Sequence, residues 1–196
     1  VIRAAAFKNG YDSTNVDTHS YLFVNDIIRQ STSAPPGWPS GSVNGQRYQY
    51  GMNQSVVNST NSQIGGVEKV KDALKSLPAI SIVTEQANLT SAQTGIYSNP
   101  QRDGVAWERE SSVEMIFPPN WIDSYGNEKG FQSPCGLRIR GGYSRRTQNP
   151  KHSFRLFFRS EYGNGRLNYP IYGDEGADVF NKFDLRGPQN YSWAQG

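Results

Sequence analysis

The sequence predicts an α+β fold that is dominated by antiparallel strands and contains one short helix. Its 196 residues include 20 glycines and 11 prolines, a composition typical of chains with many turns. Aromatic residues account for 12% of the chain, which argues against disorder. Several short segments alternate apolar and polar residues, as half-buried strands do. A chain of this length could bury a substantial core.

The first part of the sequence reads as a pair of strands. Residues 1–8 lead into the turn dipeptide Asn9-Gly10, and residues 18–24 form the second expected strand. Two strands alone are marginally stable in water, so we expect residues 1–28 to be the end of a larger β module. The chain starts at Val1 inside a strand pattern and ends without the composition of a tail. We therefore expect a segment truncated at both ends, whose lack of a signal peptide says nothing about export.

The composition changes after the first two strands. Residues 29–66 are rich in Ser, Asn, Gln, Gly and Pro, which predicts a linker or a long surface loop. Apolar residues then recur at helical spacing from Val67 to Leu77. This pattern predicts an amphipathic helix near 65–76 that ends before Pro78.

The remaining elements are strands joined by turns. A turn is expected at 123–130, and strands are expected at 79–84, 96–100, 111–117, 137–140, 153–158 and 180–186. In the strand at 153–158, Leu156 alternates in step with Phe154 and Phe158, so we expect these three side chains to face the core. Phe157 would then share the other face with Arg155.

Charge and reactive residues exclude several classes of protein. The net charge is only +3, so a general nucleic-acid signature is missing, and no apolar run approaches the ~18 residues of a membrane span. Cys135 is the single cysteine, so an internal disulfide and a cysteine metal site are excluded, and we expect it to be semi-buried. His19 and His152 lie far apart in the sequence and form no ligand cluster.

Cations concentrate in the stretch RGGYSRRTQNPKHSFRLFFR, which runs from Arg140 to Arg159 between two expected strands. A glycine-containing loop between strands can cradle a phosphate, because glycines let backbone N–H groups approach the anion and nearby cations neutralise it. Arg155 is the most informative cation, since a charge inside a strand must face solvent, a carboxylate or a ligand. The expected cofactor-binding residues are Gly141, Gly142, Ser144, Arg145, Lys151 and Arg155.

The same stretch has other interpretations. Paired glycines are common turn chemistry in a hairpin, and loop arginines are often simply solvated. A nucleic acid could stack on Phe154, Phe157, Phe158 and Tyr162 beside an arginine. The strand parity assigns part of this set to the core, so we expect no nucleic-acid partner.

Acidic residues offer partners for these arginines. Glu108 and Glu110 could pair with Arg138 or Arg140 across the sheet, an ordinary ion pair worth ~0.2–1 kcal/mol. The functional alternative is that Glu108 orients a phosphate-binding arginine. The acidic residues further along match no catalytic or metal-binding pattern, so the catalytic residues are unknown and no metal site is expected; they are Asp174, Glu175, Asp178 and Asp184.

Motifs follow one another in a specific order over roughly residues 73–193. They are ALKSLPAISIVTEQANL, TGIYSNP, WERESSVEMIF, CGLRIRGGYSRR, PKHSFRLFFRSEYG, GRLNYPIYG and FDLRGPQNYSW. This order resembles the CotH kinase family, the spore-coat-type atypical protein kinases. The stretch VIRAAAFKNGYDSTNVDTHSYLF at the start is similar to the last strands of a chitobiase/β-hexosaminidase C-terminal-type β-sandwich module, through Arg3-Ala4-Ala5-Ala6, Asn9-Gly10 and Thr18–Tyr21.

The resemblance implies a β-rich, kinase-like amino-terminal lobe at residues 67–196, preceded by the partial β-sandwich at 1–28 and the linker at 29–66. CotH-like proteins transfer phosphate from ATP to serines of partner proteins. ATP and Mg²⁺ are therefore the implied cofactors, and the implied partners are a protein substrate and neighbouring modules of the same chain. The basic hairpin would cover the nucleotide. The resemblance also implies an exported bacterial protein, extracellular or at the cell surface.

One departure from the family limits this expectation. The family's catalytic and metal-binding acids lie beyond the LRGPQNYSW segment, so we expect this segment to be inactive alone even if the parent protein is a kinase. The alternative is a non-catalytic structural or adhesion module of a large surface protein. A carbohydrate-active protein would need paired carboxylates on a suitable scaffold, and the sequence shows none.

Overall fold

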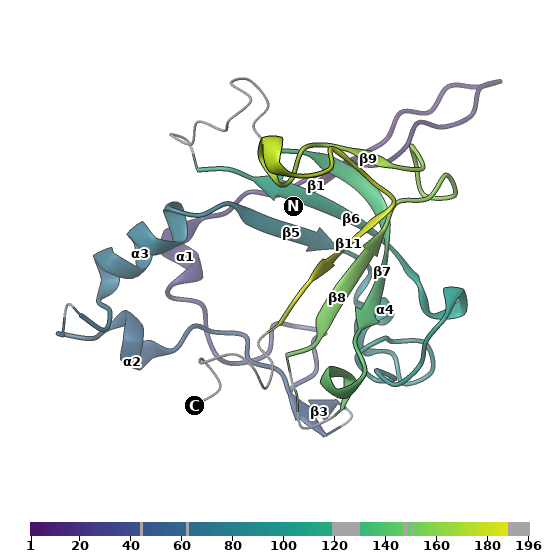
Figure 1. Cartoon of the computed structure of the whole chain (residues 1–196). Helices are drawn as coiled ribbons and strands as arrows, with labels where there is room; N and C mark the ends of the chain where they lie inside the picture. The colour runs from purple at the N-terminus through teal and green to yellow at the C-terminus, as the bar shows by residue number, and fades with distance from the viewer. Residues whose placement is uncertain (44, 62, 119–129, 147–148, 150, 188–196) are drawn as a thin grey trace.

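The computed structural model describes residues 1–43, 45–61, 63–118, 130–146, 149 and 151–187, and it confirms a mixed α+β fold with a curled antiparallel sheet (Figure 1). Five strands form the sheet in the order β11-β8-β7-β6-β5. Their bounds are Ala79–Val83 (β5), Arg109–Ile116 (β6), Gln132–Arg140 (β7), Ser153–Phe157 (β8) and Lys182–Leu185 (β11). All five were expected from the sequence, whereas nearly all of the turn expected at 123–130 lies outside the described residues.

One face of the sheet carries the main core. Leu137 lies opposite Leu156. Because side chains alternate along a strand, Phe154, Leu156 and Phe158 share this face, as the sequence predicted. Leu156 and Phe158 are buried, and Phe154 packs against the same core. Cys135 also belongs to this core and is fully buried, deeper than the semi-buried position expected.

The opposite face of the sheet is charged along β7, β8 and β11. Arg155 lies opposite Arg138 on one side and opposite Asp184 on the other. Arg140 is two residues beyond Arg138 and shares this face. We call it the polar face. Phe157 belongs to it by alternation and is nevertheless buried, because arginine side chains lie over its ring.

Turns and a short helix cover one part of the apolar face. α4 (Gln86–Thr90) is followed by turns that bring Ile96 into the core. The strand expected at 96–100 is therefore wrong. The physical reason is local pairing: the Gly95 N–H donates to the Ser91 carbonyl, and the Asn99 side-chain amide donates to the carbonyls of Ala92 and Gly95.

A two-stranded ladder covers another part of the apolar face. β9 (Leu167–Asn168) pairs antiparallel with β10 (Val179–Phe180), and between them lies the short 3-10 helix η3 (Gly173–Glu175). Leu167 and Tyr169 are both buried in the main core.

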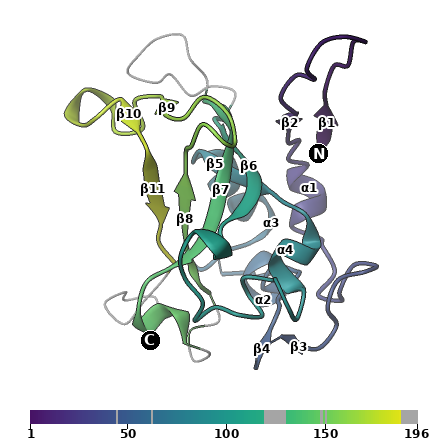
Figure 2. The same cartoon turned by 90° about the vertical axis from the view of Figure 1, so that its right-hand side faces the viewer.

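The amino-terminal strand pair is confirmed, although the second strand is shorter than expected. β1 (Ile2–Ala4) pairs with β2 (Asp17–His19), with Arg3 opposite Thr18. The backbone N–H of Ser20 donates to the Glu114 carboxylate, which ends the ladder. The expected strand at 18–24 instead gives way to helix α1 (Val24–Ile27). This hairpin stands beside the sheet near β6 (Figure 2).

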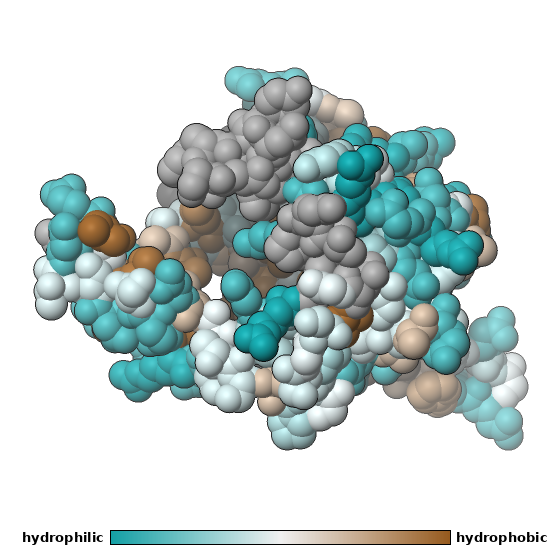
Figure 3. Space-filling model, turned by 90° about the horizontal axis from the view of Figure 1, so that it is seen from below, coloured by the Kyte–Doolittle hydropathy of each residue, from teal (hydrophilic) through white to brown (hydrophobic). Residues whose placement is uncertain are grey.

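Three helices form a second, smaller core. They are α1, α2 (Gln54–Val57) and α3 (Val67–Lys75), and α3 confirms the helix expected near 65–76. Their shared buried residues are Ile28, Val57 and Val70. The Ser- and Asn-rich segment at 29–66 supplies α2 and a small hairpin of β3 (Ser42–Val43) and β4 (Gln46–Arg47). Figure 3 shows this helical part projecting from the body of the sheet, with a hollow between the two.

Candidate functional site

A pocket of about 380 Å³ opens on the polar face where β7 ends and the chain turns toward β8. Strands β7 and β8, the loop between them and the segment before the 3-10 helix η1 (Val105–Trp107) form its walls. We call it the arginine pocket, because its lining includes Arg138, Arg140, Arg145 and Arg155, together with Asp103, Gly141 and Gly142.

The structure brings four of the six expected site residues to this pocket. Gly141, Gly142, Arg145 and Arg155 line it. Lys151 does not. It lines a separate cavity of about 370 Å³, whose other walls include Arg47, Tyr48 and Tyr97.

Ser144, the sixth expected residue, shapes the loop and does not line the pocket. It lies in the 3-10 helix η2 (Tyr143–Arg145) and is buried. Its hydroxyl donates to the Arg140 carbonyl at 3.2 Å, and its own carbonyl accepts from His152 Nδ1 at 2.7 Å. Burial lowers the pKa of His152, which favours the neutral imidazole in this contact.

Gly141 meets a backbone requirement of this loop. Its φ is +115°, a conformation that residues with a side chain rarely adopt, and a Cβ there would collide with the Ser144 hydroxyl. Gly142 has φ −107° and open space around it. The loop therefore needs a glycine at the first position of the pair only.

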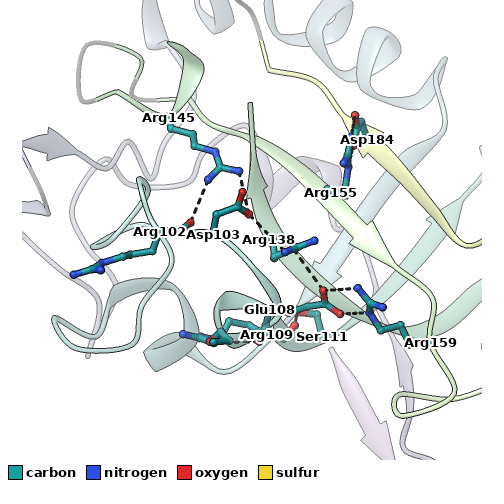
Figure 4. Close-up of polar contacts among 11 residues, drawn as sticks. Arg102, Asp103, Glu108, Arg109, Ser111, Arg138, Arg145, Arg155, Arg159 and Asp184 are labelled. Atoms are coloured by element: carbon teal, nitrogen blue, oxygen red, sulfur yellow. Dashed lines mark hydrogen bonds and ion pairs between the residues drawn. The ribbon is translucent and has the colours of Figure 1, made fainter. Parts of the chain in front are cut away.

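A carboxylate holds Arg155 on the polar face. Its Nη2 donates to Asp184 Oδ2 at 2.9 Å and its Nε donates to Oδ1 (Figure 4). Arg140 Nε also donates to Oδ2. Hydrogen bonding from Arg155 holds the pKa of Asp184 below its ordinary value, and Arg140 adds to the effect. A charge inside this strand was expected to face solvent, a carboxylate or a ligand, and the structure shows a partner carboxylate.

Glu108 is the buried anchor of the polar face. Its carboxylate accepts from Arg159 Nε at 2.8 Å and Nη2 at 3.3 Å, and its Oε2 lies 3.5 Å from Arg138 Nε. Its side chain is 0% exposed. The guanidinium groups of Arg138 and Arg159 lie 4.0 and 4.9 Å from the centre of the Phe157 ring, so both arginines are stacked as well as paired.

Asp103 links the loop to the sheet. Its Oδ1 lies 3.4 Å from Arg145 Nη2 and 3.5 Å from Arg138 Nη1. Arg145 also donates to the Arg102 carbonyl at 3.2 Å. A hydrogen bond from the Gly104 backbone, followed by the nearby arginines, lowers the pKa of Asp103. Arg138 is thus shared between Asp103 and Glu108 (Figure 4).

The resulting network is cationic. Among the described residues, five arginines (138, 140, 145, 155 and 159) meet three carboxylates (103, 108 and 184), an excess of two positive charges. Arginine forks suit carboxylates and phosphates, so the pocket can bind an anion but offers no nucleophile of its own.

The expected list of site residues missed Arg138, Arg140 and Asp103. The two arginines carry a signal that could have found them, because in the segment RIR they sit two apart and therefore share a face. Asp103 carries none, since only the folded chain brings it to Arg145. Of the pairings expected for Glu108 and Glu110 with Arg138 or Arg140, the structure shows that of Glu108 with Arg138. Arg140 pairs with Asp184 instead, and Glu110 forms no ion pair among the described residues.

The described part of the chain contains no cluster of metal-binding side chains. No group of three or more His, Cys, Asp or Glu side chains there could hold a metal ion. Within the same residues, no helix is long and apolar enough to cross a membrane.

Comparison with known proteins found no match for this chain, so the geometry of the site is the basis for its interpretation. The chain matches no family model, no curated protein and no solved structure.

Proposed function

We propose that the arginine pocket binds the phosphates of ATP and that the chain is the nucleotide-binding, amino-terminal part of a CotH-like protein kinase. The observation that carries this proposal is the convergence of four arginines and the Gly141-Gly142 backbone on one pocket. In a longer, exported bacterial protein, this lobe would serve the transfer of phosphate from ATP to serines of a partner protein.

The chemistry of the pocket supports a phosphate ligand. Guanidinium groups donate paired hydrogen bonds to phosphate oxygens, and the two unbalanced positive charges favour a polyanion. Gly141 borders the pocket and, as a glycine, has no Cβ there, so an anion can approach the backbone closely. When bound, ATP would supply the phosphoryl group, and the residues of this chain would hold and orient its anionic tail.

Mg²⁺ does not fit the described residues. Phosphoryl transfer needs carboxylates to bind the metal and to orient the attacking hydroxyl. Asp184 is already bound by Arg155 and Arg140, and Asp174 and Glu175 are exposed on η3. The proposal therefore assigns nucleotide binding to this chain and the catalytic carboxylates to another part of the protein, so that residues 1–196 alone bind ATP without transferring phosphate.

Arg140→Gln tests the proposal, with Arg146→Gln as its matched control. Arg140 lines the pocket, and Asp184 keeps Arg155 when Arg140 is replaced. Arg146 is an exposed cation of the same loop that stacks on Tyr143 outside the pocket. We expect Arg140→Gln to weaken ATP binding about tenfold in calorimetry, because it removes one charged hydrogen bond, and Arg146→Gln to leave it nearly unchanged. If both variants weakened ATP binding equally, the binding would come from diffuse attraction between charges and not from the pocket.

A second candidate is a non-catalytic structural or adhesion module. The observation that favours it is that the arginines of the pocket already have carboxylate partners, as they would in a purely structural network. ATP-dependent thermal stabilisation separates the two. If ATP raises the melting temperature of the wild type but not of Arg155→Ala, the nucleotide proposal stands; if ATP stabilises neither, the structural module is the better description.

A further inference from the structure

The cavity that contains Lys151 has no role in the proposed nucleotide site. It has a volume of about 370 Å³ and lies where the chain after the β3–β4 hairpin packs against the body of the protein. Tyr97 and Lys151 line it from the body, and the rest of its described lining comes from one run of chain, Arg47, Tyr48, Gln49 and Gly51. We call it the tyrosine cavity. Among the described residues, it has no lining residue in common with the arginine pocket.

Aromatic packing holds the Tyr48 side of this cavity in place. The centre of the Tyr48 ring lies 5.6 Å from that of Tyr97, which packs against the main core. Further along the same run of chain, the Tyr50 hydroxyl donates to the Pro39 carbonyl at 2.7 Å, and the Trp38 ring lies edge-on to the Tyr50 ring at 6.1 Å. The cavity wall is therefore fixed by contacts within the segment and by its contact with the body.

The two tyrosines offer ring surface to a ligand and no charge. Each residue is half-buried, and the Tyr48 hydroxyl is buried, so only the ring of this side chain can meet a ligand. Burial raises the pKa of both tyrosines, that of Tyr97 to about 12, so both are neutral at physiological pH. Aromatic rings pack favourably against other rings. The cavity therefore suits a ligand with a flat apolar face.

The positive charge of the tyrosine cavity is not neutralised by the described residues. Arg47 and Lys151 are exposed, and neither forms an ion pair within the described ranges. The described lining also contains no acidic residue. The arginine pocket differs, because each of its four arginines has a carboxylate partner. A hydrogen bond from the His152 backbone to Tyr97 keeps the neighbouring Lys151 beside the aromatic wall.

We propose that the tyrosine cavity binds a small aromatic anion, a planar ring that carries one or two carboxylate groups. Arg47 and Lys151 balance its charge, and the rings of Tyr48 and Tyr97 pack against its ring. The volume is at the lower end of the range for small-molecule sites, which suits a compact ligand. This inference does not rest on the proposed nucleotide site, because the two cavities have different linings.

Calorimetry on the full chain tests the proposal with isophthalate, a benzene ring with two carboxylates. Its controls are cis-1,3-cyclohexanedicarboxylate, which keeps the charges without the planar ring, and isophthalamide, which keeps the ring without the charges. We expect isophthalate to bind and to raise the melting temperature, and both controls to bind at least about tenfold more weakly. Absence of isophthalate binding overturns the proposal, as does equal binding of the cyclohexane compound, which would mean attraction between charges alone.

Two lysine variants decide whether the cavity is responsible for the charge preference. Lys151→Gln should weaken isophthalate binding about tenfold, because it removes one of the two cations. Lys8→Gln makes the same change beside another tyrosine, since Lys8 Nζ lies 4.5 Å from the centre of the Tyr11 ring in the amino-terminal hairpin. We expect this control to bind isophthalate normally. Similar losses from the two variants would contradict a defined site.

Two tyrosine variants test the aromatic wall. Tyr48→Phe keeps the ring and removes a buried hydroxyl, so isophthalate affinity should not change, whereas Tyr48→Leu should lower it about fivefold. Unchanged affinity in Tyr48→Leu would show that the ring makes no contact with the ligand and would sink the proposal.

Competition separates this site from the nucleotide site. We expect ATP not to displace isophthalate and Arg140→Gln to leave isophthalate binding unaltered, whether or not ATP itself binds. Displacement by ATP together with weaker isophthalate binding in Arg140→Gln would place the aromatic anion in the arginine pocket and overturn this inference, while leaving the nucleotide proposal intact.

Discussion

Individual carboxylates on the polar face each hold two arginines, and these contacts decide which cations remain available to a ligand. Glu108 is fully buried between Arg138 and Arg159, whereas Asp184 joins Arg140 and Arg155 at a more exposed position. Removing one partner of a buried pair leaves an uncompensated charge, so Glu108 is a poor position for testing function by substitution. Asp184 suits experiments better because its neighbours keep access to water.

Stability should therefore depend on pH through Asp184. Its folded-state pKa is lowered, so its ion pairs stabilise the fold fully above its unfolded pKa of about 4 and are lost as pH falls through the lower folded value. We expect the difference in unfolding free energy between wild type and Asp184→Asn to shrink as the pH falls below about 4 in urea titrations. Asp174→Asn, at an exposed position on η3, should show no such trend. A difference between wild type and Asp184→Asn that stays constant with pH would refute this role.

At the scale of the element, the β7–β8 connection depends on one glycine of its pair. Gly141→Ala forces a side chain into a left-handed conformation and against the Ser144 hydroxyl, so we expect it to lower the unfolding free energy by about 1–3 kcal/mol. Gly142→Ala meets nothing within 4 Å and should change stability by less than about 0.5 kcal/mol. Urea denaturation of both variants measures this. Similar losses at the two positions would mean that the loop does not have the conformation described.

The strands on either side of this connection have two different faces, and both are buried in part. Leu156 packs into the apolar core, while its neighbour Phe157 is covered by Arg138 and Arg159. Parity along the strand predicted the first contact. It could not predict the second, because a strand pattern does not reveal which distant side chains will cover its polar face.

At the scale of the whole molecule, Cys135 can serve as a probe of whether the sheet opens, because it lies in the middle strand and in the main core. It is fully buried, and burial raises the pKa of its thiol to about 12, with the Glu108 charge adding to the effect. Only the thiolate reacts with disulfide reagents. We expect native Cys135 to be labelled only when the sheet opens, at a rate that rises with urea in parallel with global unfolding.

Ser33→Cys in a Cys135→Ser background provides the exposed control, and it should be labelled at once in the absence of urea. Fast labelling of Cys135 under the same conditions would show that the sheet opens locally, without unfolding of the whole molecule.

The sequence by itself determined the elements whose signal is local. The alternation in β6, β7 and β8 and the helical spacing of α3 depend on near neighbours, and all four elements were expected. β7 begins at Gln132, five residues before its expected start at Leu137. The glycine and arginine content of the β7–β8 loop likewise pointed to most of the pocket. The segment 96–100 shows the limit, since its strand-like composition is overridden by turn hydrogen bonds that a packed loop provides.

Only the tertiary structure decided which charges meet. Arg159 and Glu108 are 51 residues apart, and Arg155 and Asp184 are 29 apart, so no local pattern connects them. Strand pairing brings them together and thereby fixes how much positive charge is left in the arginine pocket. Packing of the amino-terminal hairpin against β6 and β7 forms a cavity between them in the same way. Local preferences act through neighbouring residues, whereas charge balance and cavities depend on contacts that exist only after the chain has folded.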